Sequence, residues 1–448
     1  MMDNWLKTSL LLCIFGFLKE IRPSEPYVTH FLVGHWKNFT TNEVYEQIYP
    51  VGTYSTLALL VLVFLVTDYV RHKPVIIADA AFGIAIYSIL IWGQGIPLMQ
   101  FMEVLYGGFM AGEVAYYTYI YASVDRDKYQ MVSGHTRAAY LVGRCTSGVM
   151  AQVLVSTNAM DYLELNYITL GAMIAATAWA FLLPPTKSSI YFHRDKSIVP
   201  SQVGEERGEA SIAEEPPQGR AARAFHFLWG DLKAAYTNMS VVKWSLWWAL
   251  ATCGYYQVLS YTQVIWEEII QESGQQLYNG AVEALYTIIG ALSALALGTL
   301  PLRWAVLGPP ALASCALAQA ATIYAIATTN DLWLAYACYI ICLAAYQAMV
   351  TIASSEIAKQ LKEESFGLIF GMNMFIALAL QSILTLVVIN WLKVPPRGQF
   401  VIYGSYFAVL GAGFVLVTLY SMIKGDWRGV TFKSLWLPKT QERAAASQ

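Results

Sequence analysis

The sequence has 448 residues, of which 57% are hydrophobic and 13% are charged, and its formal net charge is −2. A soluble domain carries roughly 25% charged residues, so this composition excludes an ordinary water-soluble protein. The near-zero charge also excludes the broad basic field of a nucleic-acid-binding protein. With a mean hydropathy of +0.46, we expect a chain of membrane-spanning helices, because helices satisfy their backbone hydrogen bonds internally in lipid.

Apolar stretches follow one another along most of the chain. A membrane-spanning helix needs about 20 mainly apolar residues. By this criterion the sequence predicts twelve spans, at 6–32, 46–70, 74–94, 97–123, 130–156, 161–184, 241–268, 278–299, 302–326, 331–357, 366–391 and 398–423.

A polar segment rich in Gly and Pro separates the first six spans from the last six, and its composition is typical of a flexible linker. We therefore expect a six-helix bundle at 1–184, a linker at 185–240, a second six-helix bundle at 241–424 and a tail at 425–448. This all-α plan of six plus six helices resembles the major facilitator superfamily. Its members bind substrates near the midplane of the membrane, between the two halves.

The distribution of basic residues in the loops predicts the orientation. Arg71, Lys73 and Lys128 fall in loops on the same side as the linker, and the opposite loops carry few basic residues. Because basic loops stay in the cytoplasm, both termini and the linker are predicted to be cytoplasmic. Asn38 begins an N-glycosylation sequon, Asn38–Phe39–Thr40, which this topology places outside the cell.

The fourth predicted span carries two acids and two tyrosines on one face. At about 100° per residue, that face falls within an arc of about 80° and comprises Glu103, Tyr106, Met110, Glu113 and Tyr117. A charge at membrane depth usually faces a cavity or an opposite charge. One interpretation is a cation site, because carboxylates supply charge and aromatic rings hold flat or cationic ligands. The alternative is two structural ion pairs with arginines of neighbouring spans.

The first span is interrupted at 21–26, where two prolines break the helical hydrogen bonds. Arg22 and Glu25 are three residues apart and can pair with each other. Broken helices in transporters often line the substrate path, and the alternative is a structural kink with an internal ion pair.

Further polar residues lie in the fifth and eighth spans. Asn279 and Glu283 open the eighth span four residues apart, and Asn279 could either bind a heterocycle or cap the helix. Arg137 and Arg144 share one face of the fifth span. They are candidate partners for Glu103, Glu113 or Asp79.

Motifs for other chemistry are missing from the sequence. The six cysteines lie in apolar stretches without a CxxC pair, which favours packing roles. We find no nucleotide-binding loop, no metal-ligand cluster and no nucleophile with a base. The sequence therefore predicts neither an enzyme nor a pump, with no cofactor and no metal.

Long ordered blocks resemble the reduced-folate-carrier and thiamine-transporter family of vitamin carriers (solute carrier family 19). The blocks are IRPSEP at 21–26, KNFT at 37–40, TDYVRHKPVII at 67–77, GEVAYYTYIY at 112–121, WSLWWALATCGYYQVL at 244–259, LYNGAVEAL at 277–285, FGMNMFIAL at 370–378 and YGSYFAVL at 403–410. The resemblance implies the facilitator fold and import of a vitamin across the plasma membrane without ATP hydrolysis.

The resemblance also bears on which vitamin is carried. The folate branch has basic residues at three cavity positions, and these align with Glu113, Leu343 and Gln381, none of which is basic. Glu113 instead matches an acid of the thiamine carriers, so the resemblance implies thiamine. By the same resemblance Glu25, Glu103, Tyr106 and Asn279 match positions that line the thiamine pocket.

Five residues, at four places in the chain, depart from the vertebrate thiamine carriers. Gly52 replaces a pocket Trp, Arg144 replaces a Tyr, Ile86–Tyr87 replaces Thr–Trp, and Asp79 replaces Gln. Arg144 could neutralise Asp79 or Glu113. Alternatively, it could adapt the pocket to another vitamin, such as a thiamine phosphate or pyridoxine.

We therefore expect a thiamine importer that works by alternating access in the lipid bilayer, with proton exchange through Glu113 as a further hypothesis. The alternatives are a carrier of folate or another organic anion, and a receptor with a carrier fold that binds substrate without transporting it.

Overall fold

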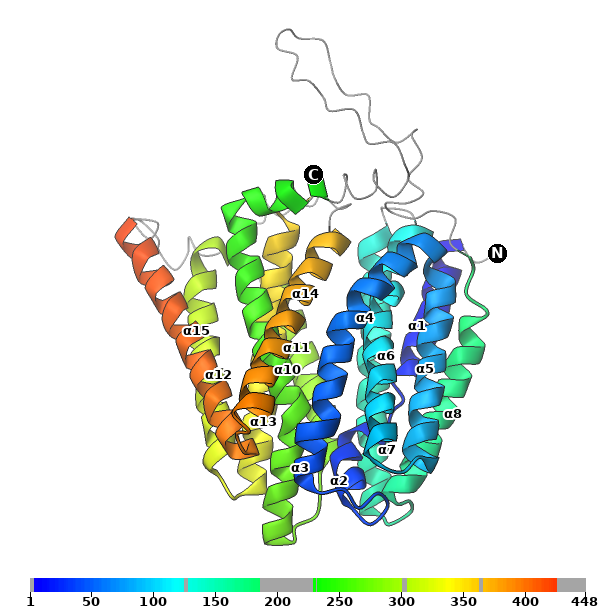
Figure 1. Ribbon diagram of the computed structural model, residues 1–448. Helices are drawn as coiled ribbons and strands as arrows, with labels where there is room; N and C mark the ends of the chain where they lie inside the picture. Colours follow the sequence, from blue (N-terminus) through cyan, green and yellow to red (C-terminus); the bar gives the residue numbers. More distant parts are fainter. Residues whose placement is uncertain are drawn as a thin grey trace.

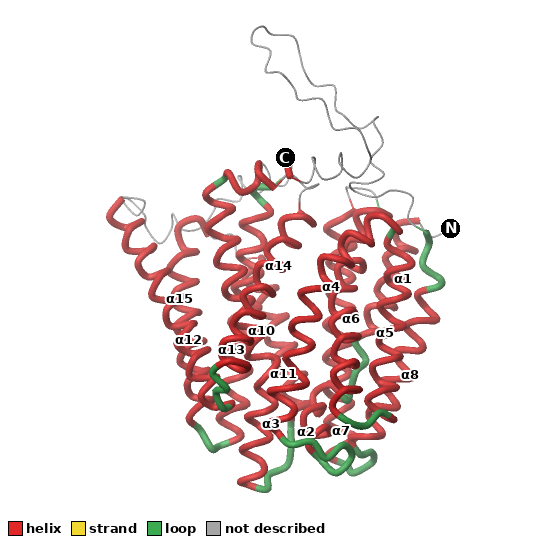
Figure 2. The backbone as a smooth tube through the Cα atoms, in the orientation of Figure 1, coloured by secondary structure: helices red, strands yellow, loops and turns green. Residues whose placement is uncertain are grey.

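The protein is an all-α bundle in this computed structural model, which describes residues 4–124, 128–185, 229–230, 232–299, 304–361 and 366–424. Twelve helices of 16 residues or more are found in these ranges, and no strand is. They form two groups of six that stand side by side (Figure 1). Inside each group, short loops, drawn green in Figure 2, join most of the successive helices. The predicted linker and tail lie mostly outside the described residues, as 186–228 and 425–448.

The N-terminal half contains the helices up to residue 180. They are α1 (Asn4–Lys19), η1 (Glu25–Tyr27), α2 (Val28–Val33), α3 (Thr41–Glu43), η2 (Val44–Ile48), α4 (Tyr49–Val70), α5 (His72–Trp92), α6 (Ile96–Ser123), α7 (Tyr129–Ser156) and α8 (Tyr162–Ala180).

The C-terminal half follows with six long helices. They are α10 (Met239–Ser273), α11 (Asn279–Thr299), α12 (Trp304–Thr328), α13 (Leu332–Ala358), α14 (Phe366–Thr385) with its π-helical end η6 (Leu386–Trp391), and α15 (Pro396–Lys424).

Eight stretches in these helices are both long and apolar enough to cross a membrane. The other four long helices are α1, α6, α8 and α10. Helix α1 has only 16 residues, and α6 carries the two acids Glu103 and Glu113. The predicted fold class, a polytopic all-α membrane protein of the facilitator type, is confirmed.

The predicted break in the first span is present. Helix α1 ends at Lys19, and helical structure resumes only at η1 and α2, so the predicted span at 6–32 is a helix plus two short pieces. Arg22 Nη1 lies 3.1 Å from Glu25 Oε2 and Arg22 Nη2 lies 2.9 Å from Glu20 Oε2. The predicted Arg22–Glu25 pair is therefore present, and Glu20 adds a second acid.

The described chain starts and finishes at the same face of the bundle. The beginning of α1, the end of α8, the beginning of α10 and the end of α15 all lie at the top in Figure 1. An even number of crossings in each half requires this arrangement. The lower face carries the turn between α2 and α3, where the side chain of Asn38 is exposed.

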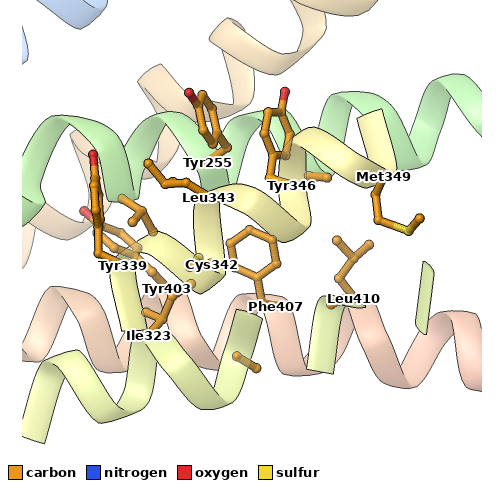
Figure 3. Close-up of a cluster of buried hydrophobic side chains, with 14 of the residues drawn as sticks. Tyr255, Ile323, Tyr339, Cys342, Leu343, Tyr346, Met349, Tyr403, Phe407 and Leu410 are labelled. Carbon is orange, nitrogen blue, oxygen red and sulfur yellow. The ribbon is translucent and has the colours of Figure 1, made fainter. Parts of the chain in front are cut away.

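The core of the C-terminal half is packed between α10, α12, α13 and α15 (Figure 3). Leu343 and Phe407 are fully buried in it. The rings of Tyr255 and Tyr346 stack with centroids 4.0 Å apart. Such dense packing resists deformation, so this half is suited to moving as one body.

The two halves approach each other most closely where α7 meets α11. A Cβ atom added to Gly280 would lie 2.7 Å from the carbonyl oxygen of Gly148 and 2.9 Å from the backbone nitrogen of Gln152. The backbone of Gly280 also donates a hydrogen bond to Tyr27 Oη at 3.2 Å. Small residues at this crossing allow the close approach, as at other membrane helix pairs.

We expect Gly280→Ala to destabilise the protein by about 1–3 kcal/mol, because the added methyl group meets rigid backbone atoms and overpacks the contact. Thermal unfolding of the purified protein in detergent measures the effect. Gly171→Ala is the matched control, since a Cβ at Gly171 meets nothing within 4 Å. Equal unfolding temperatures for both variants would contradict this description of the α7–α11 contact.

Candidate functional site

A cavity of about 540 Å³ lies between the two halves. This volume falls within the range of about 300–1,000 Å³ that small-molecule sites occupy. Residues of α4, α5, α6 and α7 line one side, and residues of α10, α11, α13 and α14 line the other. The position matches the midplane site expected for a carrier made of two halves.

One face of α6 forms a wall of this cavity. The five residues that the sequence places on one helical face, namely Glu103, Tyr106, Met110, Glu113 and Tyr117, all line it. The wall is therefore both acidic and aromatic, and it faces the C-terminal half.

The two carboxylates of this wall have no partner in the part of the chain that the structure describes. Neither Glu103 nor Glu113 forms a hydrogen bond or an ion pair with another described residue, and Glu103 is 8% exposed. An ionised carboxylate at membrane depth is costly unless a cation or hydrogen-bond donors compensate it. A cationic ligand in the cavity would supply this compensation.

Arg144 lines the cavity but pairs with neither of these acids. Its Nε donates to Glu283 Oε1 at 2.7 Å, its Nη2 makes a second contact with the same oxygen, and its Nη1 lies 3.1 Å from Tyr140 Oη. The expectation that Arg144 neutralises Asp79, Glu103 or Glu113 is therefore wrong. Glu283 belongs to α11, so the ion pair joins the two halves.

Asp79 pairs with Lys19 instead, at 2.7 Å, and both side chains are buried. Lys19 is the last residue of α1, directly before the break in the first span. The sequence did not predict the Lys19–Asp79 pair. The position of Lys19 depends on where α1 ends, and that in turn depends on where the break in the first span begins. Arg137 forms no ion pair with Glu103 or Glu113 in the described part of the chain. Its guanidinium lies over the ring of Tyr140, 5.6 Å from the ring centroid.

Glu25 lines the cavity at the broken helix, with its side chain 32% exposed and paired with Arg22. Asn279, in contrast, is not among the lining residues. It is buried, its Nδ2 donates to the carbonyl of Pro26 at 2.8 Å, and its Oδ1 accepts from Tyr336 Oη at 2.7 Å. In this conformation the hydrogen bond from Asn279 to Pro26 connects the C-terminal half to the broken first span.

The described residues that line the cavity include four acids and one base. The acids are Glu25, Glu103, Glu113 and Glu283 and the base is Arg144, which leaves a formal charge of −3. Arg22, outside the lining, is shared between Glu25 and Glu20, so one negative charge remains beside the broken helix. The two α6 acids are the lining carboxylates without an ion-pair partner among the described residues.

The rest of the lining is mainly aromatic and apolar. Rings come from both halves, so a flat ligand could be enclosed between them. The aromatic residues are Tyr49, Tyr87, Tyr106, Tyr117, Trp248, Tyr256, Tyr339 and Phe370. Five of them were not singled out from the sequence, because no charged residue marks their positions: Tyr49, Trp248, Tyr256, Tyr339 and Phe370.

Of the three positions aligned with basic residues of the folate branch, two reach the cavity. Glu113 and Gln381 line it, whereas Leu343 is fully buried in the core of the C-terminal half (Figure 3). No lysine or histidine is found among the described lining residues. Arg144, the one base among the described lining residues, is paired with Glu283, so these residues offer a dianion no unpaired basic group.

Known proteins similar to this chain include relatives named for thiamine transport and for folate transport. The pattern of the reduced folate carrier family matches residues 3–402. Thiamine transporter 1 of Mus musculus is 39% identical, over 94% of this chain and 91% of its own. Folate transporter 1 of Caenorhabditis elegans is 38% identical, over 93% of this chain and 94% of its own.

Among solved structures, the POT family transporter PepTSo superposes with a TM-score of 0.64 at 11% identity. The match covers 94% of this chain and 99% of that one. At this identity the likeness concerns the fold.

We expect Glu283→Gln to destabilise the protein by about 3 kcal/mol, because Arg144 loses the anion that compensates it. The double variant Arg144→Gln/Glu283→Gln should recover most of the loss. Thermal unfolding of the single and double variants measures the coupling. As a control, Lys359→Gln removes the partly exposed pair with Glu356 and should change stability by less than about 0.5 kcal/mol. Additive effects of the two substitutions would disprove the coupling.

Proposed function

This chain belongs to the reduced folate carrier family, and we propose that it imports thiamine across the plasma membrane by alternating access. The supporting observation is the pair of unpartnered carboxylates, Glu103 and Glu113, on an aromatic cavity wall. Thiamine carries a positive thiazolium ring and a flat aminopyrimidine ring. The first is attracted by the acids, and both can stack on tyrosine side chains.

The charge of the cavity supports thiamine over folate. Two unit charges 4 Å apart interact by about 4 kcal/mol at an effective dielectric constant of 20. Lining residues with a formal charge of −3 would attract a cation and repel a dianion. Sequence identity does not separate the two, since relatives named for thiamine and for folate transport are 39% and 38% identical to this chain.

The arrangement of the contacts supports an inward-facing state. Hydrogen bonds between the halves gather near the lower face, where His30 Nδ1 lies 2.8 Å from Glu267 Oε2 and Gln263 donates to the carbonyl of Glu25 at 3.1 Å. The cavity lining extends the other way, to Thr118, Trp248 and Phe370, toward the face that carries the ends of α6 and α8 and the start of α10 (Figure 1).

Under the orientation we propose, that open face is cytoplasmic, together with both termini. Asn38, exposed near the opposite face, would then be accessible to glycosylation outside the cell. Release of substrate into the cytoplasm would be followed by rocking of the halves, which opens the lower face.

Labelled thiamine uptake in cells that lack their own carriers tests the proposal. Glu103→Gln and Glu113→Gln should each reduce uptake about tenfold or more, because a charge-assisted contact is lost. Glu272→Gln, an exposed acid at the lower end of α10, is the matched control and should stay within about twofold. Excess unlabelled folate should not compete.

The outcomes separate the alternatives. A well-expressed wild-type protein without uptake would overturn the thiamine assignment and direct the test to pyridoxine, thiamine phosphates and folate. Thiamine binding without flux would identify a receptor instead of a carrier.

We further propose that a proton leaves as thiamine enters, with Glu113 as the proton site. Under this exchange, lowering the external pH from about 8 to 6 should slow uptake, because it opposes proton exit. Glu113→Gln should flatten the pH profile of whatever uptake remains. A wild-type rate that does not change over this range would exclude proton exchange through this acid.

A further inference from the structure

Gly52 lies on the cavity wall where α4 meets α6. A Cβ atom built on Gly52 would collide with Oε2 of Glu103, and it would lie 3.3 Å from Cδ and 3.8 Å from Cβ of that residue. The carboxylate of Glu103 therefore occupies the space that a side chain at position 52 would fill.

The helix contact around this notch is rigid. Gly107, one turn after Glu103, packs so closely on α4 that an added Cβ would lie 2.6 Å from Cβ of Ser55 and 2.7 Å from the backbone nitrogen of Thr56. Thr56 in turn donates from its hydroxyl to the carbonyl oxygen of Gly52 at 2.8 Å. Backbone contacts thus fix the notch, whereas the carboxylate inside it is the end of a flexible side chain.

Nothing else in the described part of the chain holds this carboxylate. Glu103 has no hydrogen-bond or ion-pair partner there, so its position depends on the shape of the wall. Each larger residue at position 52 would push the acid toward the centre of the cavity. The acid would then take space that a substrate ring could otherwise fill.

We propose that Gly52 is the positioning residue of the cation site: the missing side chain lets the Glu103 carboxylate retract into the α4–α6 notch. An aromatic organic cation then meets the negative charge at the wall and has the full width of the cavity for its ring. The inference rests on the proposed function, because it assigns the substrate cation to Glu103.

Gly52→Ala tests the assignment by transport kinetics. The new methyl group meets only a movable carboxylate, so the protein should fold. The KM for labelled thiamine should rise about tenfold, which corresponds to about 1.4 kcal/mol, while the maximal rate is retained. In a Glu103→Ala background the same substitution should leave the KM unchanged, because no carboxylate remains to be displaced.

Two glycine variants serve as controls. Gly107→Ala meets backbone atoms of α4 and should reduce the amount of folded protein instead of changing KM alone. Gly171→Ala, with nothing within 4 Å of its Cβ position, should change neither.

A second measurement does not depend on the substrate. A lipid-soluble carbodiimide labels carboxyl groups inside membranes, and mass spectrometry of the Glu103 peptide gives its rate. We expect faster labelling of Glu103 in Gly52→Ala than in wild type, because the carboxyl group moves out of the notch. Unchanged labelling in a folded Gly52→Ala variant would overturn the proposal. If the wild type took up no thiamine, the proposed function would fail, and the labelling comparison would still decide the role of Gly52.

Discussion

The buried ion pair Lys19–Asp79 and the partly buried ion pair Arg144–Glu283 determine what the rest of the cavity can do. Each uses a basic side chain that would otherwise be available to the acids of α6. An unpaired charge in a low-dielectric interior costs several kcal/mol, so a basic side chain there is more stable when it pairs with a nearby acid. Because these partners are already engaged, the α6 acids remain open to a cation from solution.

Arg144–Glu283 has a second consequence, since it joins the halves beside the cavity. Together with His30–Glu267 and the bonds of Tyr27 and Asn279, it closes the lower side of the interface. A typical hydrogen bond contributes about 1 kcal/mol net, so these few contacts add up to several kcal/mol. Reversing a two-state equilibrium from 1:99 to 99:1 requires about 5.5 kcal/mol. The closure is therefore of a strength that a bound ligand could shift.

Local patterns predicted most of the fold. The spans, the break at the prolines, the Arg22–Glu25 pair and the shared face of α6 all depend on residues close in sequence, where helical geometry leaves few choices. Arg144 and Glu283 are 139 positions apart, and Lys19 and Asp79 are 60 apart. Helical periodicity gives the face of a residue but not the neighbour it meets, so the sequence assigned Arg144 and Asp79 the wrong partners.

Asn279 shows the same limit in another form. Asn279 and Glu283 are four residues apart on α11, and this spacing predicted a shared polar face. Glu283 does reach the cavity. Whether the amide points into the cavity or to the carbonyl of Pro26 depends on the angle between the halves. Under the alternating access proposed above that angle changes, and the contacts of Asn279 would then belong to one conformation.

Substrate preference in such a family depends on a few positions. Relatives named for a cationic and for an anionic vitamin share almost the same identity with this chain. Overall identity therefore does not distinguish the two kinds of substrate. A charge reversal at a cavity position such as Glu113 changes the interaction with a charged ligand by several kcal/mol, and Gln381 opposite adds no positive charge. The sign of the cavity, together with the shape of the wall at Gly52, is thus a better guide to the substrate than overall similarity.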